Sequence, residues 1–118
     1  MDRIAQTTTP DTTTPAGLLV DFDSVLGQDR KPFHAVKTGT TVTATVTVRS
    51  VTAYGPAGHS RGIVDGDGGW AMFYLPRDYK PRLGHVLTPG AKVMLRGTAT
   101  KVGDIPVIGV FAARAVNV

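Results

Sequence analysis

A strict alternation of polar and apolar residues near the middle of the chain constrains the fold more than any other feature. Every second position is small and apolar: Val42, Ala44, Val46 and Val48. The positions between them hold threonines and then Arg49. This period of two predicts a long strand with one buried face, because successive side chains of a strand point to opposite sides.

The alternation changes parity after Ser50, where Val51 and Ala53 hold the apolar positions. A slip of one residue without loss of strand character predicts a β-bulge. A long, bent strand of this kind, over residues 40–54, is what a small barrel needs, because one strand must pair with both ends of the sheet to close it.

Composition extends the β assignment to the rest of the 118-residue chain, which is long enough for one domain. All nine acidic residues are aspartates, and threonine and valine, which favour strands, dominate the middle. Further strands are expected over residues 61–65 and 70–75, joined by a Gly-rich turn, and over residues 91–100 and 105–116. Residues 76–89 contain three prolines and Gly84, so a loop or a single turn is expected there and not a full helix.

Three segments organise the chain. Residues 1–16 carry the repeat Thr-Thr-Thr-Pro at residues 7–10 and 12–15 and have almost nothing to bury, which predicts a disordered tail. Residues 17–39 hold a short apolar patch that we expect to pack on the side or end of the barrel, as a strand or as a helical turn. Residues 40–118 form the barrel.

The last third of the chain resembles strands four and five of nucleic-acid-binding OB-fold domains. The resemblance is carried by Pro89-Gly90 and then by Val93, Leu95, Gly97, Ile108, Val110 and Val116. The resemblance covers residues 40–118, and within the OB-fold it is to single-stranded-DNA-binding and tRNA-anticodon-binding modules. It implies a five-stranded, partly open antiparallel barrel with little helix.

OB-folds bind their ligands across strands two and three, between the one–two and four–five loops. The resemblance therefore implies a ligand face made of Arg61, Trp70, Met72 and Tyr74. Tyr54 and His59 lie on the first of the two loops. The second loop, residues 101–104, is short, which implies modest affinity.

The strand over residues 70–75 is apolar on both faces. We assign Phe73 and Leu75 to the core, which leaves Trp70, Met72 and Tyr74 facing outward. Exposed aromatic rings at this spacing act as stacking platforms for unpaired bases, each worth ~1–3 kcal/mol. Alternatively, Trp70 covers the barrel end or packs under residues 18–36.

The positive charge lies on the barrel and not on the tail. Residues 41–118 carry nine Lys or Arg and four Asp, against four and five in residues 1–40. A basic face suits phosphate binding, although a net charge of this size equally serves solubility. The predicted phosphate contacts are Arg49, Arg61, Arg77, Lys80, Lys92 and Arg96.

Nothing in the sequence predicts an enzyme, a metal site or a cofactor. The chain has no Cys, and its histidines, at positions 34, 59 and 85, have no metal-ligand spacing. Asp65-Gly-Asp67 resembles the start of a calcium loop, but its twelfth position is Pro76 and not Glu. The polar start of the chain and the lack of a long apolar run predict a cytoplasmic protein with no membrane contact.

Two functions remain. The first is binding of single-stranded nucleic acid, DNA in preference to RNA, through aromatic stacking and phosphate contacts. The second is a protein–protein interaction module that acts as an accessory subunit, in which Trp70 and Tyr74 meet a partner chain. Fold alone does not decide between them. Salt dependence does, because nucleic-acid binding weakens steeply as salt rises.

Overall fold

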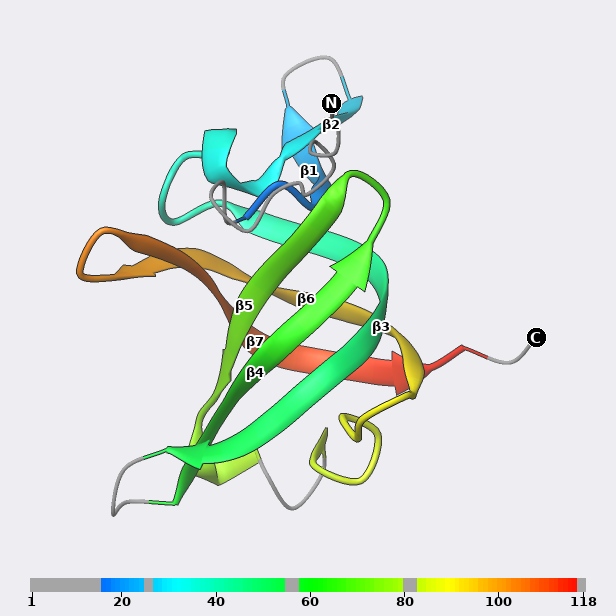
Figure 1. Cartoon of the computed structure of the whole chain (residues 1–118). Coiled ribbons are helices and arrows are strands. Elements are labelled where there is room, and N and C mark those ends of the chain that lie inside the picture. The colour runs from blue at the N-terminus through cyan, green and yellow to red at the C-terminus, as the bar shows by residue number, and fades with distance from the viewer. Residues whose placement is uncertain (1–15, 25–26, 55–57, 80–82, 117–118) are drawn as a thin grey trace, which may run out of the picture.

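In the computed structural model of the protein, residues 16–24, 27–54, 58–79 and 83–116 are described, and they form an all-β structure (Figure 1). The strands are β1 (Leu19–Ser24), β2 (Gly27–Pro32), β3 (Thr41–Tyr54), β4 (His59–Gly66), β5 (Gly69–Leu75), β6 (Lys92–Val102) and β7 (Ile105–Ala115). Among the described residues, helix is limited to two 3₁₀ turns, η2 (Phe33–Ala35) and η3 (Arg77–Tyr79), and to Leu83. None of the described helical segments is long and apolar enough to cross a membrane. The prediction of an all-β chain with little helix is confirmed.

Five of the strands close into a barrel with the neighbour order β3-β4-β5-β7-β6-β3. β3 also pairs with β6 and closes the barrel, as the long strand over residues 40–54 predicted. The structure differs from the partly open antiparallel barrel that the resemblance implied, because the barrel is closed and β5 pairs with β7 in parallel. The parallel pair arises because the chain crosses from the end of β5 to β6 before β7 returns beside β5. This small closed barrel is compatible with an OB-like fold.

The predicted bulge is present in β3. The β3–β4 register passes from Val48–Val64 to Ser50–Ile63, so Arg49 is the extra residue. Opposite the bend, a Cβ on Gly62 would lie 1.9 Å from the Ser50 carbonyl oxygen. A glycine is therefore required where β3 folds closely over β4.

The barrel interior is filled by the inward side chains of its five strands, β3 to β7. Ala71, Phe73 and Leu75 of β5 are fully buried, while Trp70 and Tyr74 on the same strand are half-buried on the outer face. This is the parity that the sequence predicts.

Residues 16–24 and 27–36, which we call the end cover, lie over one end of the barrel (Figure 1). Leu18 is 1% exposed and Val20 and Phe33 also belong to the core. Leu18 N–H donates to the Trp70 carbonyl at 3.3 Å, and Leu19 N–H donates to the Asp67 carbonyl at 2.8 Å. The packing segment that the sequence predicted is thus a β-hairpin, β1–β2, followed by η2.

The structure describes only the last residue of the predicted N-terminal tail. Residues 1–15 of the predicted tail lie outside the described residues, so its disorder stays a prediction. Ala16, which we placed at the end of the tail, is buried, and its carbonyl accepts a hydrogen bond from His34 N–H at 2.9 Å.

The opposite end of the barrel is closed by residues 83–91, the described part of the segment between η3 and β6 (Figure 1). Leu87 is buried there, and Gly90 N–H donates to the Val48 carbonyl at 2.8 Å. Val48 N–H in turn donates to the Ala91 carbonyl at 2.9 Å. Within residues 83–91, the described part of this segment, Leu83 is helical and turns follow it, in agreement with the loop or single turn that the prolines predict.

Leu18 and Leu19 form a matched pair for testing the end cover. We expect Leu18→Ala to lower the free energy of unfolding by about 2–5 kcal/mol, because it removes a fully buried side chain. Leu19→Ala, at a half-buried position, should cost clearly less. Denaturant unfolding measures both, and equal small losses would show that the end cover is not part of the cooperative core.

Candidate functional site

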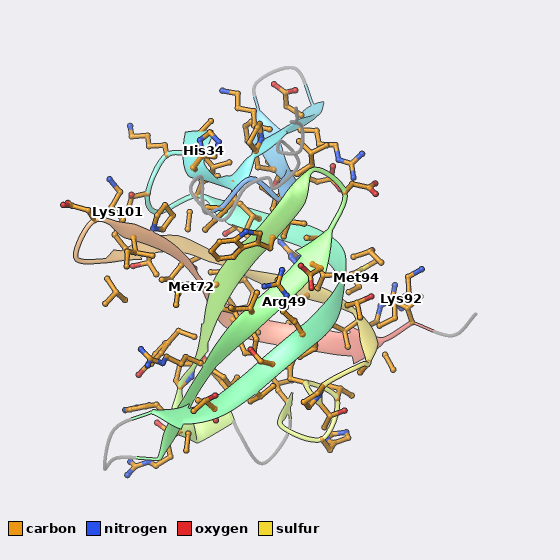
Figure 2. All side chains as sticks on the ribbon, in the orientation of Figure 1. His34, Arg49, Met72, Lys92, Met94 and Lys101 are labelled. Atoms are coloured by element: carbon orange, nitrogen blue, oxygen red, sulfur yellow. The ribbon has the colours of Figure 1, made fainter. Side chains whose placement is uncertain are left out.

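The outer face of β4 and β5 brings most of the predicted site residues together. β4 and β5 pair antiparallel, and alternate pairs point outward. Three outward rows result, Arg61–Tyr74, Ile63–Met72 and Asp65–Trp70. Figure 2 shows Met72 on the β5 side of this face and Arg49 in front of β4.

At one end of the face, two rings lie together beside an arginine. The ring centroids of His59 and Tyr74 are 5.3 Å apart, with their planes tilted by 39°. His59 Nδ1 accepts a hydrogen bond from Arg77 N–H at 3.0 Å, so Nε2 carries the hydrogen of the neutral ring. Arg61, directly opposite Tyr74, is exposed. This end therefore presents aromatic surface and positive charge side by side.

An apolar groove of about 80 Å³ runs between β5 and the β6–β7 hairpin. Its lining residues are Arg61, Met72, Phe73, Tyr74, Val102, Ile105 and Val107. The hairpin projects beyond the barrel, with Lys101 near its tip (Figure 2). Val102 and Ile105 are 54% and 45% exposed, unusually high for branched apolar residues.

Sequence reasoning missed the hairpin side chains. It treated residues 101–104 as a short loop, but the strands extend to Val102 and Ile105, and only Gly103 and Asp104 form the turn. The available signal was two branched apolar residues flanking a two-residue turn, where polar residues are usual.

The other end of the face holds a closed cluster of Arg49, Asp65 and Trp70. Arg49 Nε donates to Asp65 Oδ2 at 2.9 Å, and Arg49 Nη2 donates to Asp65 Oδ1. The Arg49 guanidinium carbon also lies 5.8 Å from the centre of the Trp70 ring. The hydrogen bonds with Asp65 raise the pKa of Arg49 above its ordinary value, so this side chain stays charged at every working pH.

This cluster changes what Arg49 and Trp70 can contribute. The positive charge of Arg49 is already balanced by a carboxylate, and one part of the Trp70 ring is covered by a cation. The Trp70 side chain faces outward, and it is the backbone carbonyl of Trp70 that contacts residue 18 of the end cover.

The remaining predicted cations are scattered. Lys92 lines a crevice with Thr47 and Asp65, near the Arg49 cluster. Arg77 forms an exposed ion pair with Asp78 at 3.7 Å. Arg96 lies elsewhere on the barrel, over the Phe111 ring of β7. The side chain of Tyr54, and Lys80 as a whole, lie outside the described residues.

No group of three or more His, Asp or Glu side chains in the described part of the chain could hold a metal ion. No protein-family model matches the sequence, and no curated protein is significantly similar to it. The candidate site therefore rests on its own geometry.

Asp65→Asn tests the Arg49–Trp70 cluster. Loss of the carboxylate should release the guanidinium from the ring and change the emission of Trp70, which is the only tryptophan. Because the pair is exposed, the loss of stability should be at most about 1 kcal/mol. Asp78→Asn, which breaks an ion pair away from the tryptophan, is the control. Unchanged emission in Asp65→Asn would contradict the cluster.

Proposed function

We propose that this protein binds single-stranded nucleic acid, DNA in preference to RNA, through the outer face of β4 and β5 and without catalysis. The observation that carries the proposal is the arrangement of Arg61, Tyr74 and His59 at the mouth of the apolar groove. An unpaired nucleotide offers a flat apolar base next to a phosphate. Aromatic rings beside a cation match both parts.

The groove supports this proposal by its shape. Its wall on one side is Tyr74 and Met72 of β5, and on the other side Val102 and Ile105 of the hairpin. A base that stacks on Tyr74 would also bury apolar surface against the hairpin, while its phosphate lies toward Arg61. No base edge is read by such contacts, so sequence preference should be weak.

Tyr74 and Trp70 differ in how well each could stack against a base. Tyr74 lines the apolar groove and has the His59 ring beside it, whereas Trp70 lies outside the groove and has an arginine over its ring that Asp65 holds in place. We therefore place the principal stacking at Tyr74. Trp70 and Arg49 contribute less than the sequence alone predicts.

The test compares Tyr74→Leu with Trp70→Leu. Titration of a labelled oligonucleotide of about 12 residues, within the usual site size, measures affinity by anisotropy. We expect Tyr74→Leu to cost ~1–3 kcal/mol of binding free energy, the worth of one stacked base. Trp70→Leu should cost less. Both variants should keep the far-UV spectrum of the wild type, since both side chains lie on the outer face.

Arg61→Gln tests the phosphate contact separately. It should lower the slope of log affinity against log salt by about one unit, because one fewer phosphate is neutralised. Asp104→Asn, at the hairpin turn, removes a charge of the opposite sign and should not lower the slope. Wild-type protein that binds neither single-stranded DNA nor RNA in a salt-sensitive way would refute the proposed function.

The exposed side chains of Val102 and Ile105 favour a second candidate, a protein partner docked on the hairpin. Such an interface depends on apolar area and resists salt. Ile105→Asp separates the two candidates, because it should abolish apolar docking. The same variant should weaken oligonucleotide binding only in part, through one lost apolar contact and through the added negative charge, whose effect high salt reduces, because the stacking on Tyr74 remains.

A further inference from the structure

A second apolar and basic surface lies on the outer face of β6 and β7. Its centre is a hollow of about 200 Å³, lined by Met94, Arg96, Ala112, Ala113 and Arg114. Phe111 beside it is 38% exposed. The exposure follows from a bulge, because the β6–β7 register passes from Gly97–Val110 to Arg96–Ala112 and leaves Phe111 as the extra residue.

The two arginines of this surface, Arg96 and Arg114, lie against an aromatic ring and a thioether sulfur. The Arg96 guanidinium carbon lies 6.0 Å from the centre of the Phe111 ring, and Arg114 Nη2 lies 3.7 Å from Met94 Sδ. Neither guanidinium has a carboxylate within ion-pair distance in the part of the chain that the structure describes. On the side facing β1, Arg96 borders a crevice that also contains Asp21 and Asp23.

Arg96 differs from Arg49 in having, among the described residues, no carboxylate that holds its guanidinium over the neighbouring ring. Arg49 also lies over an aromatic ring, but Asp65 holds it there with two hydrogen bonds. Arg96 has no such anchor, so its guanidinium can leave the Phe111 ring for an incoming anion. The ring then becomes available for stacking.

The second surface is continuous with the β4–β5 face. Tyr74 pairs laterally with Gly109 of β7, and Phe111 is two residues farther along that strand. At about 3.3 Å per residue, Phe111 lies ~7 Å and Arg114 ~17 Å from Gly109 along β7. Gly109 has no side chain to obstruct a path between the two rings. Tyr74, Gly109 and Phe111 therefore form one continuous row on the outer surface, which we call the track.

We propose that a nucleic-acid strand bound at Tyr74 continues over Gly109 along β7. The next accessible base stacks on Phe111, and Arg96 and Arg114 contact its flanking phosphates. This inference rests on the proposed function and extends it to a footprint longer than the groove alone. An acidic peptide would also satisfy the two arginines, but two flat rings in series beside cations favour a chain of bases.

The experiment uses thymidylates of one and about 12 nucleotides, because a single nucleotide at Tyr74 does not reach Phe111, whereas a strand within ordinary site sizes does. We expect Phe111→Leu to weaken binding of the longer strand by about 5- to 150-fold, the equivalent of one stacked base, and to leave the single nucleotide unaffected. Arg114→Gln should lower the salt slope by about one unit for the longer strand only. Lys37→Gln, which removes an exposed charge next to the end cover, is the matched control and should change neither.

Several results would overturn the track. One such result is that wild-type protein binds both lengths with equal affinity. Another is that the Phe111 and Arg114 variants weaken binding of both lengths equally, or of neither. A polyglutamate peptide that displaces the longer strand as well as unlabelled oligothymidylate does would show a general acidic-peptide surface instead. Failure of the track leaves single-nucleotide binding at Tyr74 intact, whereas failure of the proposed function abolishes binding at both lengths.

Discussion

The barrel depends on one strand pairing with two neighbours at once. The first half of β3 pairs with β6 and its second half with β4, so β3 must bend where one partner gives way to the other. Arg49 occupies the bulge at that bend, and Gly62 opposite it allows the close approach of the backbones. The bulge also leaves the Arg49 side chain on the outer face, within reach of Asp65 and Trp70. Barrel closure and the Arg49 cluster thus have the same origin.

The features that could be predicted from sequence are those that depend on local periodicity. The alternation over residues 41–49, its slip near Ser50 and the two faces of the strand over residues 70–75 all follow from the period of two. They correspond to β3, its bulge and the buried and outward rows of β5. The parallel β5–β7 pair could not be read in this way, because it depends on where the chain between β5 and β6 crosses the barrel.

The candidate site was predictable as a set of residues but not as a set of contacts. Arg61, Met72 and Tyr74 share the outer face because strand parity places them there. The ion pair of Arg49 with Asp65 depends on the register between β3 and β4, which no local pattern fixes. The exposed position of Ile105 depends on how far the β6–β7 hairpin extends beyond the barrel. Long-range register therefore determines which cations remain available to a ligand.

Two bulges give the outer surface its chemical asymmetry. Each places an arginine over an aromatic ring, Arg49 over Trp70 and Arg96 over Phe111. A carboxylate completes the first pair and none completes the second within the described residues. An arginine that is already neutralised has little to gain from a phosphate, whereas an unneutralised one gains a full charge-assisted hydrogen bond. On the proposed function, a nucleic-acid strand bound at Tyr74 would therefore gain more binding free energy by following β7 toward Phe111 than by turning toward Trp70.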